Sequence, residues 1–110
     1  MSGLRFDAVF SANVIHIMGW DAVKLMIQGA GNVLSNNGLL ILYGPFNYGN
    51  RYTSDSNARF DEWLKQRNPE SGIRNFENVE KLANDAQLKL LEDIAMPANN
   101  RILIWQKYQG

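Results

Sequence analysis

Two short apolar runs, separated by a helical pattern, constrain the fold of this chain more than any other feature. Phe6 to Phe10 and Leu39 to Tyr43 are too short for helices, and both predict strands buried on two faces. Between them, Trp20 to Leu34 carries apolar residues at helical spacing. A strand, a helix and a second strand favour parallel pairing with a right-handed crossover. The sequence therefore predicts an α/β fold.

The remainder of the chain predicts two more helices and an antiparallel pair of strands. Ser35 to Gly38 and Met96 to Asn100 have the composition of turns. The last two strands follow each other across the second turn, which predicts a hairpin. The predicted elements after the second strand are helices at Asn57–Arg67 and Asn75–Ala86, and strands at Leu88–Ala95 and Arg101–Tyr108. The first of these helices is expected to bury Phe60, Trp63 and Leu64.

Length, charge and composition exclude several classes of function. A chain of 110 residues suffices for one domain, residues 1–110, but not for two. The formal net charge of zero argues against nucleic-acid or acidic-membrane binding. The absence of Cys excludes disulfides and thiol chemistry, and no cluster of metal ligands can be assembled. No run is apolar enough to span a membrane and no leader is evident, so we expect a cytoplasmic protein.

The element order and four sequence blocks resemble the carboxy-terminal half of class I S-adenosylmethionine-dependent methyltransferases. Within this class, the amino-acid sequence most resembles an uncharacterised methyltransferase-like family of bacteria and animals. The resemblance covers nearly the whole chain. The blocks that carry it are FDAVFSANVIHI, LYGPFNYGNRYTSDSNARFDEWL, SGIRNFENVEKLA and MPANNRILIW.

This resemblance implies a partial Rossmann-like methyltransferase fold. Four strands would form a mixed sheet in the order 4-5-7-6 of the full fold, with helices mainly on one face and a carboxy-terminal antiparallel hairpin. The family's first three strands have no counterpart here. They would carry the glycine-rich loop and the acidic residue that bind S-adenosylmethionine. An exposed sheet face and an edge at Phe6–Phe10 then predict a homodimer through one or the other.

The first candidate site follows the first strand. Ser11, Ala12 and Asn13 lie at a strand's carboxyl end, where open α/β sheets bind ligands. Their position fits cofactor contact or simple turn formation, and the resemblance favours the cofactor. His16, the one histidine, is a weak candidate for a general base. A hydrogen-bonded structural role is the alternative.

A second group of residues predicts a substrate pocket. Flat apolar rings and fixed amides at a strand end are typical of such pockets. The alternative places the aromatic residues in the core and the Asn residues in turns. The predicted pocket residues are Tyr43, Phe46, Asn47, Asn99 and Asn100.

Three hypotheses of function follow. The chain is a truncated methyltransferase-like domain that does not catalyse alone. Alternatively, it is a binding module for a small molecule or a protein that reuses the strand-end pocket. In the third hypothesis it is an enzyme whose S-adenosylmethionine site is completed by a second chain. The sequence does not name a methyl acceptor.

Overall fold

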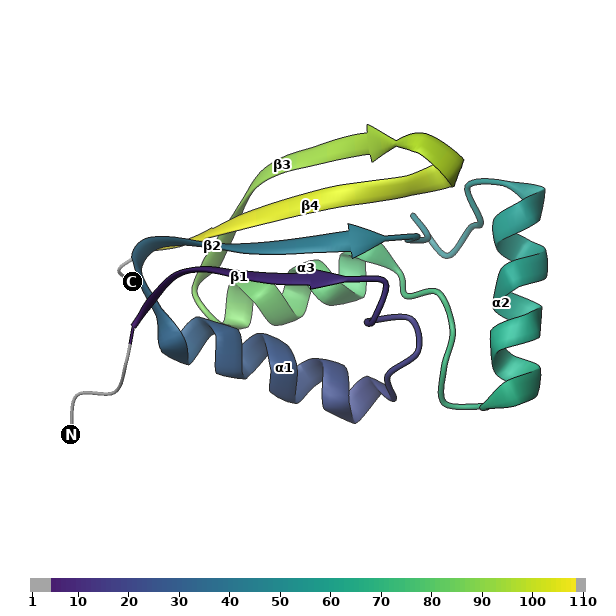
Figure 1. The fold of residues 1–110 in the computed structure, drawn as a ribbon, viewed down its shortest axis with the longest axis horizontal. Helices are drawn as coiled ribbons and strands as arrows, with labels where there is room; N and C mark the ends of the chain where they lie inside the picture. Colours follow the sequence, from purple (N-terminus) through teal and green to yellow (C-terminus); the bar gives the residue numbers. More distant parts are fainter. Residues whose placement is uncertain (1–4, 109–110) are drawn as a thin grey trace.

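The computed structural model describes residues 5–108, and within them the chain forms one four-stranded mixed sheet and three α-helices (Figure 1). The strand order is β1-β2-β4-β3. β1 and β2 are parallel, and β4 runs antiparallel to both of its neighbours. The predicted class and strand order are confirmed. The elements are β1 Phe6–Ala12, α1 Trp20–Val33, β2 Leu34–Gly44, α2 Asp55–Arg67, α3 Phe76–Asp85, β3 Leu88–Met96, the 3-10 turn η1 Pro97–Asn99, and β4 Asn100–Lys107.

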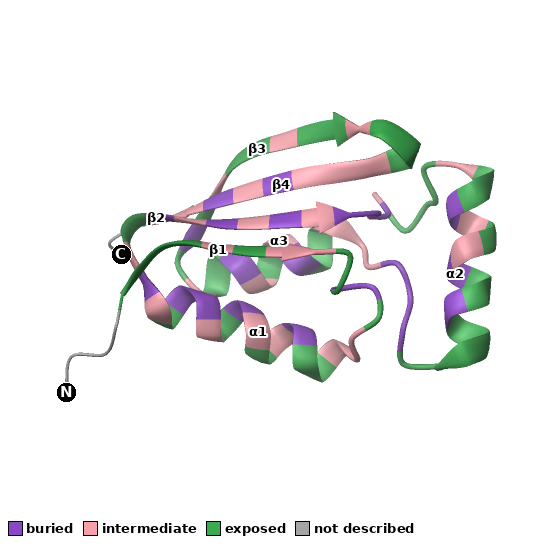
Figure 2. Ribbon diagram, viewed as in Figure 1, coloured by how far each residue is buried: buried purple, intermediate pink, exposed green. Residues whose placement is uncertain are grey.

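The core lies between one face of the sheet and the helices α1 and α3. Leu40 of β2 pairs with Trp105 of β4, and both are fully buried. Val23 and Ile27 of α1 and Val79 of α3 are also fully buried against this face. Figure 2 shows the buried sides of both helices turned toward the strands. The apolar residues at helical spacing in Trp20 to Leu34 therefore include those that α1 contributes to the core.

Helix α1 contains a G-x-G motif, Gly29-Ala30-Gly31, which lets α1 pack closely against the end of α3. A Cβ atom on Gly31 would lie 2.8 Å from the backbone oxygen of Ala86, at the end of α3. Only a residue without a side chain allows this approach of the two elements.

The opposite face of the sheet is apolar and uncovered in the described part of the chain. Phe10 of β1 pairs with Ile41 of β2, which pairs with Ile104 of β4, so the three side chains share this face. Phe10 is 63% exposed, so the prediction that Phe6 to Phe10 is buried on two faces is wrong: β1 is an edge strand with one face uncovered. Figure 1 shows α1 and α3 together on the other side of the sheet. The prediction that helices lie mainly on one face is confirmed.

The predicted turn at Ser35 to Gly38 is wrong, because β2 begins at Leu34, directly after α1. Leu34 pairs with Phe6, and the register then shifts before Ala8 pairs with Leu39. The Ser35 hydroxyl donates to the Phe6 carbonyl oxygen at 3.1 Å. Turn-type residues thus form an irregular start to the strand.

The prediction that Trp63 is buried in α2 is also wrong, since Trp63 is 48% exposed. α2 stands beyond the end of the sheet, so no apolar layer faces it along its whole length (Figure 1). Its inward side is partly polar and includes the buried Asn57 and Asp61. The helix begins at Asp55, and the Ser54 hydroxyl caps it by accepting from the Asn57 N–H at 3.0 Å.

Candidate functional site

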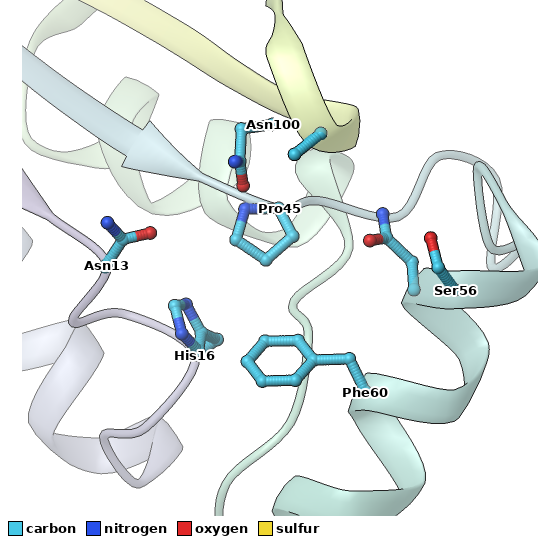
Figure 3. A pocket seen from close by; sticks show the side chains of 8 residues that line it. Asn13, His16, Pro45, Ser56, Phe60 and Asn100 are labelled. Atoms are coloured by element: carbon cyan, nitrogen blue, oxygen red, sulfur yellow. The ribbon is translucent and has the colours of Figure 1, made fainter.

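A cavity of about 430 Å³ lies beyond the carboxyl ends of the parallel strands β1 and β2. The turn after β1, the loop after β2, helix α2 and the β3–β4 hairpin tip all contribute to its walls (Figure 3). Its volume is within the range of small-molecule sites, and ligands of open α/β sheets bind at this edge. The lining residues are Asn13, His16, Pro45, Ser56, Asn57, Phe60, Ala98 and Asn100.

The turn after β1 begins at Asn13 and places His16 in the wall. The Asn13 N–H donates to the Tyr43 carbonyl oxygen at 2.8 Å, which extends the pairing with β2 by one bond. Asn13 then adopts a left-handed backbone with φ of 57°. Asn tolerates this conformation better than most residues do. Ile15, which is 2% exposed, anchors the turn in the core.

His16 is buried, with a ring that lacks one hydrogen-bond partner. Its side chain is 5% exposed, and Nδ1 has no partner within residues 5–108. Burial, together with the nearby positive charge of Arg74, lowers the pKa of His16 from its usual 6.5. The imidazole is therefore neutral at pH 7, and a neutral imidazole can accept a proton or a hydrogen bond.

Two carboxamides are fixed at the hairpin side of the cavity. The Asn57 amide nitrogen donates to Thr53 Oγ1 at 2.9 Å and to the Asn99 carbonyl oxygen at 3.5 Å. The Asn100 amide nitrogen donates to the Tyr43 hydroxyl at 3.4 Å and to the Pro97 carbonyl oxygen at 3.3 Å. These bonds link α2, β2 and the hairpin tip around the cavity.

Asp61 holds α2 in place next to this cavity. The side chain, 2% exposed, accepts from the Ile73 N–H at 2.8 Å, from Lys65 Nζ at 2.8 Å and from the Tyr52 hydroxyl. Burial alone would raise the pKa of Asp61, but the bonds from Lys65, Tyr52 and Ile73 together lower it. The neighbouring Phe60 is thereby set against the His16 ring.

The structure brings three of the predicted site residues to the cavity: Asn13, His16 and Asn100. Tyr43 touches its edge through the hydrogen bond with Asn100, and Asn99 binds there through its backbone oxygen. These five residues come from three separate parts of the sequence, around positions 13–16, 43 and 99–100.

Four predicted site residues lie elsewhere. Phe46 is fully buried in the core, as the alternative interpretation expected. Asn47 is 9% exposed, and its amide nitrogen donates to the Ile73 carbonyl oxygen at 3.4 Å. Ser11 and Ala12 are the last residues of β1 and are half-buried there, outside the cavity walls.

Five wall residues were missed by sequence reasoning. Phe60 was predicted in the core, although its helix leaves the sheet. The spacing of Asn57 and Asp61 was a usable signal, because two polar residues one turn apart on the inward side of a helix need partners. The missed residues are Pro45, Ser56, Asn57, Phe60 and Ala98.

The cavity wall carries no Lys, Arg, Asp or Glu among the described residues. Residues 5–108 also contain no group of three His, Asp or Glu side chains that could hold a metal ion. No helix within the same range is both long and apolar enough to cross a membrane. The site therefore works through aromatic rings, amides and one neutral imidazole.

Comparison with known proteins identifies the family of the chain. The model of the family described as "Protein of unknown function (DUF938)" matches residues 2–107. The chain belongs to the DUF938 family. Its match leaves out only the first residue and the last three of the sequence.

Solved structures similar to this DUF938 chain are methyltransferases. An O-methyltransferase family 2 protein from Planctomyces limnophilus, in complex with apigenin, matches with a TM-score of 0.83 at 18% identity over 92% of this chain. An O-methyltransferase family protein from Burkholderia thailandensis matches with a TM-score of 0.83 at 18% identity over 98% of this chain. Human N-acetylserotonin methyltransferase, in complex with S-adenosylmethionine, matches with a TM-score of 0.79 at 12% identity over 94% of this chain.

These likenesses concern the fold, and they cover a minor part of each neighbour. The chain spans 30%, 32% and 30% of the three structures, respectively. The DUF938 chain thus has a methyltransferase-like, Rossmann-like fold that corresponds to about a third of the length of these proteins.

The residues present do not fit S-adenosylmethionine as a complete site. Within residues 5–108, no carboxylate lines the cavity to hold ribose hydroxyls, and no cation lines it to pair with the cofactor's carboxylate. The Asn13 N–H at the strand end is already bonded to Tyr43. The G-x-G motif lies inside α1 and packs on α3.

Proposed function

We propose that this chain is the acceptor-binding part of an S-adenosylmethionine-dependent methyltransferase-like domain, and that it does not catalyse methyl transfer alone. The observation that carries the proposal is the cavity at the ends of β1 and β2, with His16 in its wall. Methyltransferases of similar fold support the reaction class.

His16 gives the cavity one group with acid–base chemistry. Its buried, neutral imidazole can take up a proton from an acceptor hydroxyl or amine, provided that the group comes within hydrogen-bond reach of Nδ1. The edge of Phe60 and the surrounding core hold the ring in one orientation. We propose His16 as the base and Asn13, Asn57 and Asn100 as the groups that orient the acceptor.

The chain by itself does not catalyse methyl transfer in this proposal, because it lacks the contacts that hold the cofactor. The sulfonium of S-adenosylmethionine is already activated, so a methyltransferase mainly aligns the two reactants. A chain that binds only the acceptor leaves the methyl donor unaligned. We propose that the glycine-rich half of a methyltransferase fold is required, on this or another polypeptide.

Two other functions remain alternatives. In one, the chain is a binding module that uses the cavity for a small molecule without any transfer. In the other, a second chain completes the cofactor site, and the uncovered face around Ile104 or the β1 edge provides the contact. Both retain the same cavity.

Calorimetry with S-adenosylmethionine separates these functions. The proposal predicts no heat beyond dilution and no methyl transfer for the chain alone. Binding with a micromolar Kd contradicts the proposal and favours the completed site. If no cofactor binds, we would test the isolated chain with small aromatic ligands. A ligand bound in the cavity, for which no methyl transfer occurs even with a cofactor-binding half added, favours the binding module.

A further inference from the structure

We infer that the cavity takes a flat, uncharged ligand that donates hydrogen bonds to the protein. The inference rests on the proposed function and deepens it, because it names the chemical class of the acceptor. Three properties of the wall carry it: the flat rings, the state of the amides and the absence of charge.

The two flat rings of His16 and Phe60, together with Pro45, set the shape of the ligand. The rings of His16, Pro45 and Phe60 surround one space in Figure 3. The planes of His16 and Phe60 are inclined by 64°, with centroids 5.4 Å apart. Aromatic ligands stack on or meet the edges of such rings favourably, at centroid distances of about 4.5 to 7 Å. A planar ring therefore gains more contact here than a branched aliphatic group.

Two of the three wall amides, those of Asn57 and Asn100, leave acceptors but no free donor for the ligand. A carboxamide has two N–H donors and one oxygen with two lone pairs. Asn57 and Asn100 each use the amide nitrogen for two bonds within the protein. Their oxygens therefore remain for a ligand. In Figure 3 the oxygens of Asn13 and Asn100 both point to the side of the cavity on which Pro45 lies.

His16 adds a buried atom that supports the same conclusion. Nδ1 is buried and has no partner within residues 5–108. A buried polar atom without a partner costs about 1–3 kcal/mol. Nδ1 has almost no accessible surface, so a ligand N–H or O–H recovers that cost only by displacing the atoms that cover it. Because the imidazole is neutral, Nδ1 accepts such a bond when the proton lies on Nε2.

The absence of charge excludes anions as good ligands. No Lys or Arg among the described residues lines the wall, and its polar groups are uncharged amides, a hydroxyl and an imidazole. Arg74, whose charge acts on His16, donates instead to the carbonyl oxygens of Met18 and Glu70. A carboxylate or phosphate in the cavity would lose its hydration without gaining a counter-ion.

Three flat probes of similar shape test the inference: benzamide, acetophenone and benzoate. Benzamide carries the N–H donors, acetophenone has a methyl group in their place, and benzoate replaces them by a negative charge. We would titrate each into the whole labelled chain and follow backbone amide shifts by NMR. We expect benzamide to shift residues of the cavity wall with a Kd of about 1 mM, and the other two to bind about tenfold more weakly or not at all.

Two matched variants test whether the Asn100 side-chain oxygen accepts a hydrogen bond from benzamide. Asn100→Ala removes one wall oxygen and should weaken benzamide binding about fivefold to tenfold. Asn84→Ala removes an exposed amide on α3, far from the wall, and should leave the Kd unchanged. Retained NMR dispersion in both variants checks that they fold.

Equal affinity for all three probes overturns the inference, as does tighter binding of benzoate or a lack of shifts at the cavity with benzamide. None of these results depends on S-adenosylmethionine. Failure of the proposed function appears instead as cofactor binding or methyl transfer by the chain alone, so the two failures are distinguishable.

Discussion

The ring of Phe60 meets the ring of His16 edge to face, with centroids 5.4 Å apart. This contact joins α2 to the turn after β1 across the cavity. Two segments that are 44 positions apart in sequence (60 minus 16) thus determine one wall of the site. The protonation state of His16 consequently affects both the stability of the fold and the chemistry of the site.

Protonation of His16 should destabilise the folded chain. Its folded pKa lies below the usual 6.5, so as the pH falls below about 6.5 the unfolded chain takes up a proton that the folded chain resists. Stability should therefore fall on acidification, with a slope of at most about 1.4 kcal/mol per pH unit for one proton. Urea denaturation between about pH 7.5 and 5.5, above most carboxylate titrations, measures this.

His16→Gln is the comparison for that experiment. It keeps a polar side chain but has no titrating group, so the slope over the same pH range should become flatter. An unchanged slope would show that another group causes the pH dependence.

Removal of the Asp61 carboxylate should cost much more than removal of an exposed one. Asp61→Ala leaves the Ile73 N–H buried without its acceptor and removes the bonds to Lys65 and Tyr52. We expect a loss of about 2–3 kcal/mol in the free energy of unfolding. Asp85→Ala, which breaks only the exposed ion pair with Lys81, should cost less than about 0.5 kcal/mol. Similar losses for both would contradict the role of Asp61.

The two helical glycines of α1 should respond in opposite directions to the same change. Gly31→Ala places a methyl group 2.8 Å from the backbone of Ala86 and should destabilise the fold by about 1–3 kcal/mol. A Cβ on Gly29 meets nothing within 4 Å, so Gly29→Ala should stabilise by about 0.5–1 kcal/mol through helix propensity. Thermal denaturation measures both. Gains for both variants would mean that α1 and α3 are not closely packed at Gly31.

The uncovered sheet face should pair with a second copy of the chain. Its central strands present Ile41 and Ile104 beside the exposed Phe10, and such an apolar face favours burial. We expect a dimer by analytical ultracentrifugation at micromolar concentration. Ile104→Glu should give a monomer, whereas Leu25→Glu, at a 69% exposed position on α1, should not.

The outcome of that experiment also distinguishes the two modes of pairing. A dimer that persists in Ile104→Glu uses the β1 edge, where backbone groups make the contact. A wild-type chain that is a monomer at these concentrations contradicts both modes.

The sequence predicted those elements whose apolar spacing matches a packed layer. Leu40, Leu42 and the apolar stripe of α1 lie in the core as predicted, because β2 and α1 pack these residues against each other, whereas Ile41 lies on the uncovered face. Trp63 could not be placed, because its exposure depends on α2 leaving the sheet. That departure depends on the bonds of Asp61 to residues outside the helix, which the periodicity of α2 does not contain.

The site was predictable in position but not in composition. Strand ends identified Asn13 and the neighbourhood of Tyr43, because ligands of parallel sheets bind at that edge. Phe60 and Asn57 reach the cavity only through the placement of α2, which is a tertiary effect. Ala98 joins them through a hairpin tip in which it adopts φ of 61°, a conformation that Ala rarely takes and that composition did not indicate.

Backbone amide NMR of the chain with and without S-adenosylmethionine tests the central claim most directly, because it reports both binding and its location. The account predicts that the cofactor leaves the signals of Asn13, His16 and Gly44 unchanged, since the chain lacks the contacts that hold it. Saturable shifts at these strand-end residues, with a micromolar Kd, would contradict the account and show that the chain binds the cofactor by itself.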